Sequence, residues 1–214
     1  IVAEVNEDIK QEHYAKLWKK FGHYVISAML LIIVATATGV WWKQRALVKN
    51  KNQGSQVLLA TQKAINGDNQ SAIDILSKLA QEAPPGLSAL ANIQEAALLV
   101  EEGEFEKAND AYLAAYKNNS APREFKDLAE LLLLSNGFYQ EKLELLPDFQ
   151  SRLQKLIDNK SPWHFSAVEL MAVYHYRQQN TAESNTLYQN IIAADAAPAR
   201  MKLRAREMVE LIKG

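Results

Sequence analysis

Hydrophobic residues follow two different patterns along the chain. From Phe21 to Trp42 the chain contains no Asp, Glu, Lys or Arg, and apolar residues dominate this run. After residue 53, apolar residues recur at spacings of three and four, as on one face of a helix, and no alternating run indicates a strand. The sequence therefore predicts an all-α protein in which a single N-terminal transmembrane helix precedes a solenoid of helix pairs.

The uncharged run over residues 21–42 has the length of a membrane-spanning helix. About 20 helical residues cross a hydrocarbon core of ~30 Å, and aromatic residues favour the two interfaces. We predict a signal anchor that is not cleaved; its candidate residues are Phe21, Tyr24, Val25, Ile26, Leu30, Leu31, Ile32, Ile33, Val34, Trp41 and Trp42. The alternatives are a buried core helix, and a signal peptide cleaved near Ala37.

The anchor divides the chain into four segments. Residues 1–20 form a short N-terminal segment, 21–42 the anchor, 43–52 a linker and 53–214 a helical domain. Basic residues near the anchor are equally numerous before and after it: Lys10, Lys16, Lys19 and Lys20 against Lys43, Arg45, Lys49 and Lys51. Because the positive-inside rule counts these residues, it does not decide the orientation.

A helix–turn–helix pattern recurs in the domain with small residues at matching positions. Ala72, Ala108 and Ser184 occupy one such position, at intervals of 36 and 76 residues. The second interval leaves room for a degenerate pair, which we expect between Phe125 and Ile157. The pattern is typical of tetratricopeptide (TPR) repeats; the candidate repeat-packing residues are Ala60, Ala72, Ala96, Gly103, Ala108, Tyr112, Ala172, Ser184 and Tyr188.

Further signals mark individual helix boundaries. Ser161 followed by Pro162 predicts an N-cap and the first residue of a helix. Residues 198–213 are expected to form a terminal helix that covers the last apolar face. The alternative to the TPR-like solenoid is an irregular helical bundle.

Composition argues against several classes of chemistry. The chain has no Cys and a formal net charge of −1, which excludes thiolate sites and does not favour nucleic-acid binding. No phosphate-binding glycine motif occurs. We therefore predict that the protein is not an enzyme, that it binds neither nucleic acid nor a small-molecule substrate, and that it has no catalytic, cofactor-binding or metal-binding residues.

Two groups of polar residues are assigned structural roles. His164 and His175 are eleven residues apart on one predicted helix, about 16 Å along its axis, which is too far to share a metal ion. We expect both to have packing roles. Acidic residues surround the turn of the clearest repeat, at Glu101, Glu102, Glu104 and Glu106, and are interpreted as a solvated edge.

The order of these parts resembles the ancillary SecYEG translocon subunits of the YfgM type. The resemblance rests on the runs Glu4 to Lys10 and Leu17 to Tyr24, the apolar run ending in Trp41-Trp42, and the run Leu87 to Ala91 followed by Glu101 to Ala108. The chain departs from that family over residues 136–158, and at Gln179, where the turn usually has Gly.

The resemblance implies a protein of the inner (cytoplasmic) membrane with a short cytoplasmic N-terminus and a TPR-like periplasmic domain. It implies SecYEG and a periplasmic chaperone such as PpiD as partners, and a role in chaperone access to translocated proteins. Two other roles remain open from the residues: a generic cell-envelope assembly adaptor, and a regulator that sequesters a cytoplasmic factor through residues 1–20.

Overall fold

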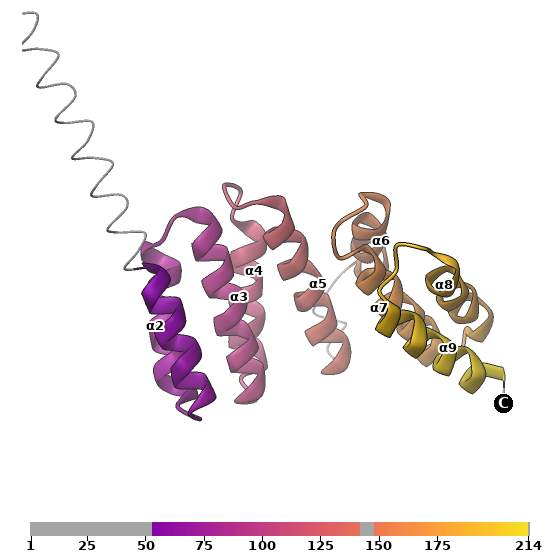
Figure 1. Ribbon diagram of the computed structural model, residues 1–214, viewed down its shortest axis with the longest axis horizontal. Coiled ribbons are helices and arrows are strands. Elements are labelled where there is room, and N and C mark those ends of the chain that lie inside the picture. Colours follow the sequence, from indigo (N-terminus) through magenta and orange to yellow (C-terminus); the bar gives the residue numbers. More distant parts are fainter. Residues whose placement is uncertain (1–52, 142–147, 214) are drawn as a thin grey trace, which may run out of the picture. The chain divides into compact units, whose positions relative to one another are not determined.

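The computed structural model describes residues 53–141 and 148–213, and every regular element among them is an α-helix. This confirms the all-α class for the part of the chain that is described. Residues 53–65 form the first helix. The labelled helices are α2 (Asn69–Glu82), α3 (Pro85–Glu101), α4 (Phe105–Lys117), α5 (Arg123–Tyr139), α6 (Phe149–Asp158), α7 (His164–Arg177), α8 (Thr181–Ala193) and α9 (Ala199–Lys213) (Figure 1).

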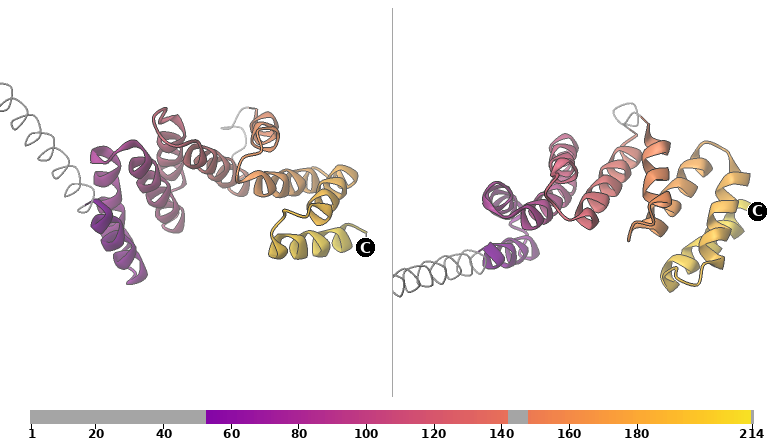
Figure 2. Two further views of the ribbon diagram at one scale, coloured as in Figure 1. Left: turned by 45° about the horizontal axis from the view of Figure 1, so that its top comes forward. Right: turned by 90° about the horizontal axis from the view of Figure 1, so that it is seen from above.

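The chain divides into two units between residues 54 and 55, and the second unit, Ser55–Gly214, is compact. Within the second unit, each labelled helix from α3 onward packs on the one before it, and α5 also contacts α3 and α7. Figures 1 and 2 show the helices following one another in chain order. Most contacts are therefore local in sequence, as in a protein built from successive helical hairpins.

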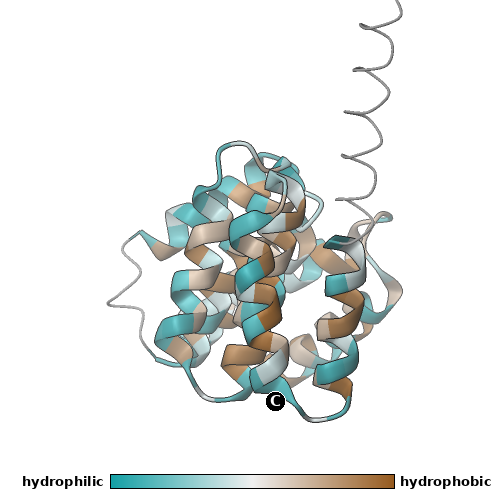
Figure 3. Ribbon diagram, turned by 90° about the vertical axis from the view of Figure 1, so that its left-hand side faces the viewer, coloured by the Kyte–Doolittle hydropathy of each residue, from teal (hydrophilic) through white to brown (hydrophobic). Residues whose placement is uncertain are grey.

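The core lies between successive helices. The helices carry apolar and polar positions on different sides, as Figure 3 shows. Buried residues form three clusters: one among residues 53–65, α2 and α3, one from α2 to α7, and one among α7, α8 and α9. Each hairpin therefore buries its apolar side against its neighbours.

The turns inside the hairpins share one backbone feature. Gly67 and Gly103 have φ angles of 79° and 77°, and Glu141 and Gln179 have φ angles of 57° and 61°. These positions follow one another at intervals of 36, 38 and 38 residues. Left-handed backbone favours Gly because a Cβ atom strains it, so two of these four turns hold a non-glycine residue in an unfavourable conformation.

Hydrogen bonds close the turns at Gly67, Gly103 and Gln179 in the same way. The N–H of Gly103 donates to the carbonyl of Val100 (3.1 Å), and that of Glu104 donates to the carbonyl of Leu99 (2.8 Å). This Schellman arrangement satisfies carbonyl groups that the end of a helix leaves unpaired. The equivalent bonds at residues 179–180 measure 3.0 and 2.9 Å.

The middle hairpin lies where the degenerate pair was expected, as α5 and α6. The Phe149 ring on α6 lies 5.9 Å from Phe138 on α5 and 5.1 Å from Tyr174 on α7, measured between ring centroids. Glu130, with 5% of its side chain exposed, accepts two hydrogen bonds from Arg152, of 2.6 and 2.7 Å. Aromatic contacts and a buried ion pair thus join α5 to α6.

The predicted start of α7 is wrong by two residues. The helix begins at His164, and Trp163 is its N-cap. The Ser161 hydroxyl accepts a 3.3 Å hydrogen bond from the Trp163 N–H. The carbonyl of Ser161 accepts a 2.9 Å bond from the His164 N–H, which closes a tight turn at Pro162 and Trp163 before the helix starts. The predicted terminal helix is present as α9.

None of the helices within residues 53–141 and 148–213 combines the length and apolar character needed to cross a bilayer. The predicted anchor over residues 21–42, including the candidates from Phe21 to Trp42, lies outside the described residues.

Candidate protein-binding site

The candidate repeat-packing residues lie in the interior or at a turn. Gly103 is exposed in the turn between α3 and α4. The other eight are buried, with at most 4% of their surface exposed: Ala60, Ala72, Ala96, Ala108, Tyr112, Ala172, Ser184 and Tyr188. The alanines and Ser184 among them let the paired helices approach closely, whereas Tyr112 and Tyr188 fill the interior with large side chains.

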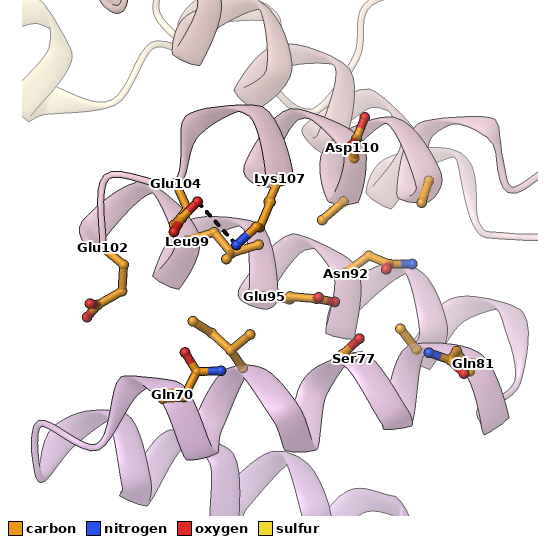
Figure 4. A pocket seen from close by; sticks show the side chains of 14 residues that line it. Gln70, Ser77, Gln81, Asn92, Glu95, Leu99, Glu102, Glu104, Lys107 and Asp110 are labelled. Carbon is orange, nitrogen blue, oxygen red and sulfur yellow. Dashed lines mark ion pairs between the residues drawn. The ribbon is translucent and has the colours of Figure 1, made fainter.

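A groove of about 720 Å³ lies along α3, between α2 and α4 (Figure 4). Such a volume falls within the range typical of ligand sites. We call it the acidic groove; its lining is Gln70, Ile73, Ser77, Ala80 and Gln81 from α2, Asn92, Glu95 and Leu99 from α3, Glu102 and Glu104 from the following turn, and Lys107, Asp110, Ala111 and Ala114 from α4.

Small side chains leave space for this groove. Ser77 and Ala80 line it from α2, and Ala111 and Ala114 line it from α4. Leu99 of α3 is buried with 6% of its surface exposed. The short side chains on both walls leave the polar groups of α3 open to a partner.

Charge in the acidic groove is predominantly negative. Glu95, Glu102, Glu104 and Asp110 line it, with Lys107 as the only cation among its lining residues. The Lys107 ammonium lies 3.3 Å from a carboxylate oxygen of Glu104, the ion pair drawn as a dashed line in Figure 4. Three carboxylates remain beyond that pair, so the groove presents a negative surface to solvent.

Glu95 is the partly buried carboxylate of the acidic groove, whereas Glu102, Glu104 and Asp110 are exposed. It is half-buried, and burial raises the pKa of its carboxyl group, while a hydrogen bond with the Ser77 side chain opposes the shift. Figure 4 shows the two side chains close together in the groove. Burial disfavours the charged form of Glu95, and a cation from a partner would compensate for that penalty.

A hydrogen bond joins the start of α2 to the end of α3 beside the acidic groove. The Asn69 amide, at the start of α2, donates a 2.7 Å hydrogen bond to Glu102 at the end of α3. This bond fixes the Glu102 carboxylate at one end of the groove. The arrangement suits binding by charge and shape, since it combines carboxylates with apolar floor residues.

His164 and His175 each lie beside a polar group of a neighbouring segment. His164 Nδ1 lies 3.0 Å from the Ile157 carbonyl, and His175 Nδ1 lies 3.5 Å from the Asn180 amide nitrogen. Over residues 53–141 and 148–213, no three His, Cys, Asp or Glu side chains gather where they could hold a metal ion. His164 therefore has its partner on the preceding helix, α6, and His175 has its partner in the turn that follows α7.

Glu102 and Glu104 were predicted to be part of a solvated edge. They are exposed, but they also line the acidic groove, which the sequence did not indicate. The signal available was the run Asn92, Glu95, Leu99 and Glu102, whose spacings of three and four put a mixed polar face on one side of α3. The sequence does not reveal that Ser77 and Ala80, from another helix, border the same face.

Comparison with known families identifies one match. The family model described as "Protein of unknown function (DUF2659)" matches residues 1–211, which is nearly the whole chain. No curated protein matches the chain.

Proposed function

The chain belongs to the DUF2659 family, and we propose that it is a membrane-anchored scaffold for protein–protein interactions. In this proposal residues 21–42 hold the protein in the inner membrane, and the helical unit lies in the periplasm. The scaffold works beside the SecYEG translocon and gives a periplasmic chaperone such as PpiD access to translocated proteins. The resemblance to YfgM-type subunits motivates the choice of partners.

The proposed architecture of the helical unit is a TPR-like solenoid capped by α9. Support comes from the left-handed turns at Gly67, Gly103, Glu141 and Gln179, whose intervals of 36, 38 and 38 residues are those of a repeat. Repeats of this kind cannot bury their apolar faces alone and stack against neighbours, which leaves extended surfaces for partners.

The acidic groove is the observation that carries the proposed function. A basic segment of a partner fits it, because lysine or arginine side chains would face Glu95, Glu102 and Asp110. Apolar side chains of the same segment would contact Leu99 and Ile73 between the charges. Electrostatic attraction of this kind raises the association rate and weakens as salt screens it.

Anchoring and docking act together in this proposal. A membrane anchor confines the groove to the neighbourhood of membrane-bound partners and raises its effective concentration there. An affinity that is modest for a single groove then suffices for stable association. The proposal needs no chemical step.

Co-purification tests the proposal. The full chain is tagged, expressed in its native membrane, solubilised in a mild detergent and captured, and the co-eluting proteins are identified. We expect translocon subunits and a periplasmic chaperone. Recovery of outer-membrane or cell-wall assembly proteins instead would favour the general adaptor role and overturn the translocon assignment.

A matched pair of charge reversals links the partner to the acidic groove. Asp110→Lys places a cation in the groove, and Asp195→Lys makes the same change at an exposed site between α8 and α9. We expect Asp110→Lys to reduce recovery several-fold at low salt and Asp195→Lys to leave it unchanged. Equal recovery with both variants would contradict the role of the groove.

A further inference from the structure

A second cavity lies among the last helices and has different chemistry from the acidic groove. It has a volume of about 400 Å³. Residues of α5, α7, α8 and α9 line it, and its apolar lining includes Leu131, Leu170, Val173 and Met208. We call it the tyrosine pocket, because Tyr188 of α8 contributes a polar group to this lining.

The Tyr188 hydroxyl is buried without a hydrogen-bond partner among the described residues. Only 1% of the residue is exposed. Burial, followed by the nearby Glu169 carboxylate, raises the pKa of the Tyr188 phenol to about 12, so the group stays neutral and keeps its proton. Buried polar groups in folded proteins are nearly always paired, so this hydroxyl is a donor open to an acceptor.

Neighbouring charged groups do not supply that partner. Arg204 donates hydrogen bonds of 2.8 and 2.7 Å to the two carboxylate oxygens of Glu169, so each side chain of this pair already engages the other. Glu207 also lines the pocket and leaves its lining with a net negative charge. An anionic ligand is therefore disfavoured, whereas a neutral acceptor meets no repulsion.

We propose that the tyrosine pocket binds a short apolar segment of a partner polypeptide, with a main-chain carbonyl of that segment accepting a hydrogen bond from the Tyr188 hydroxyl. A bulky side chain of the segment packs against Leu170, Val173 and Met208. Methionine adapts to irregular apolar surfaces and contacts aromatic rings favourably.

The size of the pocket limits the occupant to a few residues. A volume of about 400 Å³ lies near the lower end of the range for ligand sites. A neutral, apolar occupant also differs from the basic segment proposed for the acidic groove. The inference rests on the tyrosine pocket alone and stands or falls independently of the translocon role.

Methionine methyl groups provide a direct readout. Full-length chain in lipid nanodiscs, labelled with ¹³C at the methionine methyls, is titrated with the peptide N-acetyl-Gly-Phe-Gly-amide. The Met208 signal reports on the pocket, and the Met201 signal, from a buried residue of the same helix outside the pocket lining, is the internal reference. N-acetyl-Gly-Ala-Gly-amide is the control for the bulky side chain.

Two tyrosine variants separate the hydroxyl from the fold. Tyr188→Phe removes only the oxygen, and Tyr112→Phe makes the same change at the matching position of an earlier hairpin, outside the pocket. We expect the phenylalanine peptide to shift Met208 but not Met201, with about fivefold weaker binding in Tyr188→Phe, as loss of one hydrogen bond implies. Binding to Tyr112→Phe should be unchanged.

Thermal unfolding completes the test. If the Tyr188 hydroxyl serves a ligand, Tyr188→Phe should leave the melting temperature of the free protein unchanged or raise it, because no internal hydrogen bond is lost. The proposal would be overturned if the Met208 signal did not move at about 10 mM peptide, a concentration at which weak sites are occupied. Equal shifts with the alanine peptide would overturn it, and so would equal affinity in Tyr188→Phe.

Discussion

The Ser184 hydroxyl donates a 2.8 Å hydrogen bond to the main-chain carbonyl of Ala172, twelve residues earlier on the facing helix. Both residues are fully buried. The same twelve-residue interval separates Ala60 from Ala72, and Ala96 from Ala108, where both members are alanine. Close approach of two helices therefore recurs in three hairpins, and in the last one a hydroxyl adds a polar contact.

Substitution of Ser184 tests this close approach. Ser184→Ala should destabilise the protein by about 1 kcal/mol, the net contribution of one hydrogen bond. Ser184→Leu should lower the free energy of unfolding by about 1–3 kcal/mol, because a larger side chain overpacks a small buried site. Urea unfolding of the full chain in detergent, followed by circular dichroism, measures both. A harmless Ser184→Leu would mean that the two helices are not closely packed.

Left-handed turns make a second prediction. Gly103→Ala should destabilise by about 1–2 kcal/mol through backbone strain alone, since a Cβ atom there meets nothing within 4 Å. Gly54→Ala is the matched control: its Cβ also meets nothing, but its backbone is helical, so this change should stabilise by about 1 kcal/mol. Thermal unfolding distinguishes the two, and equal signs would contradict the turn assignment.

Gln179→Gly makes the reverse change at a matching turn. Its φ angle of 61° is strained for glutamine and free for glycine. We expect the substitution to raise stability by about 0.5–1 kcal/mol, observed as a higher melting temperature. A lower melting temperature would show that the glutamine side chain contributes more than its backbone strain.

The ion pair between Glu130 and Arg152 makes a further prediction. Arg152→Met would leave the buried Glu130 carboxylate without its partner, at a cost of about 3–5 kcal/mol. The double variant Glu130→Leu/Arg152→Met removes both charges and should recover most of that loss. Hydrogen exchange of α5 and α6 amides reports the local effect. Additive effects of the two changes would mean that the side chains do not interact.

Glu95 makes stability depend on pH in a defined direction. Because its pKa is raised in the folded protein, its contribution to stability is fully present below the unfolded pKa of about 4.5 and is lost as pH rises through the folded pKa. The free energy of unfolding of Glu95→Gln, relative to that of the wild type, should therefore increase as the pH rises from about 4 to about 7.

The Ser77 side chain gives the control for this pH dependence. Its hydrogen bond lowers the pKa of Glu95, so Ser77→Ala should raise that pKa further and steepen the loss of stability with pH. Unfolding curves of the three proteins across this pH range make the comparison. A difference between wild type and Glu95→Gln that does not change with pH would contradict burial as the cause.

Sequence reasoning predicted the helical class and the helix pairs because their determinants are local. Close packing of two adjacent helices requires small residues such as Ala96 and Ala108 at the contact. Their regular spacing can be recognised in a single sequence. The start of α7 was misplaced because Ser161 directs its bonds to a tight turn, a choice that composition does not reveal.

Features of the binding surfaces could not be predicted because they combine distant residues. The acidic groove needs Ser77 of α2 and Asp110 of α4 on either side of Glu95, and no spacing along the chain relates these three. Beside Tyr188, α7 and α9 likewise place Glu169 and Arg204 against each other, and no spacing along the chain predicts that pair.

In-cell photocrosslinking from the acidic groove tests the central claim most directly. The photoreactive residue p-benzoylphenylalanine replaces Gln81, an exposed lining residue of the groove, and in a control chain it replaces Asp195, which lies outside it. The account predicts crosslinks to a translocon subunit or a periplasmic chaperone from position 81 only, and their loss when Asp110→Lys is added. No crosslinked partner from position 81, or the same partners from both positions, would contradict it.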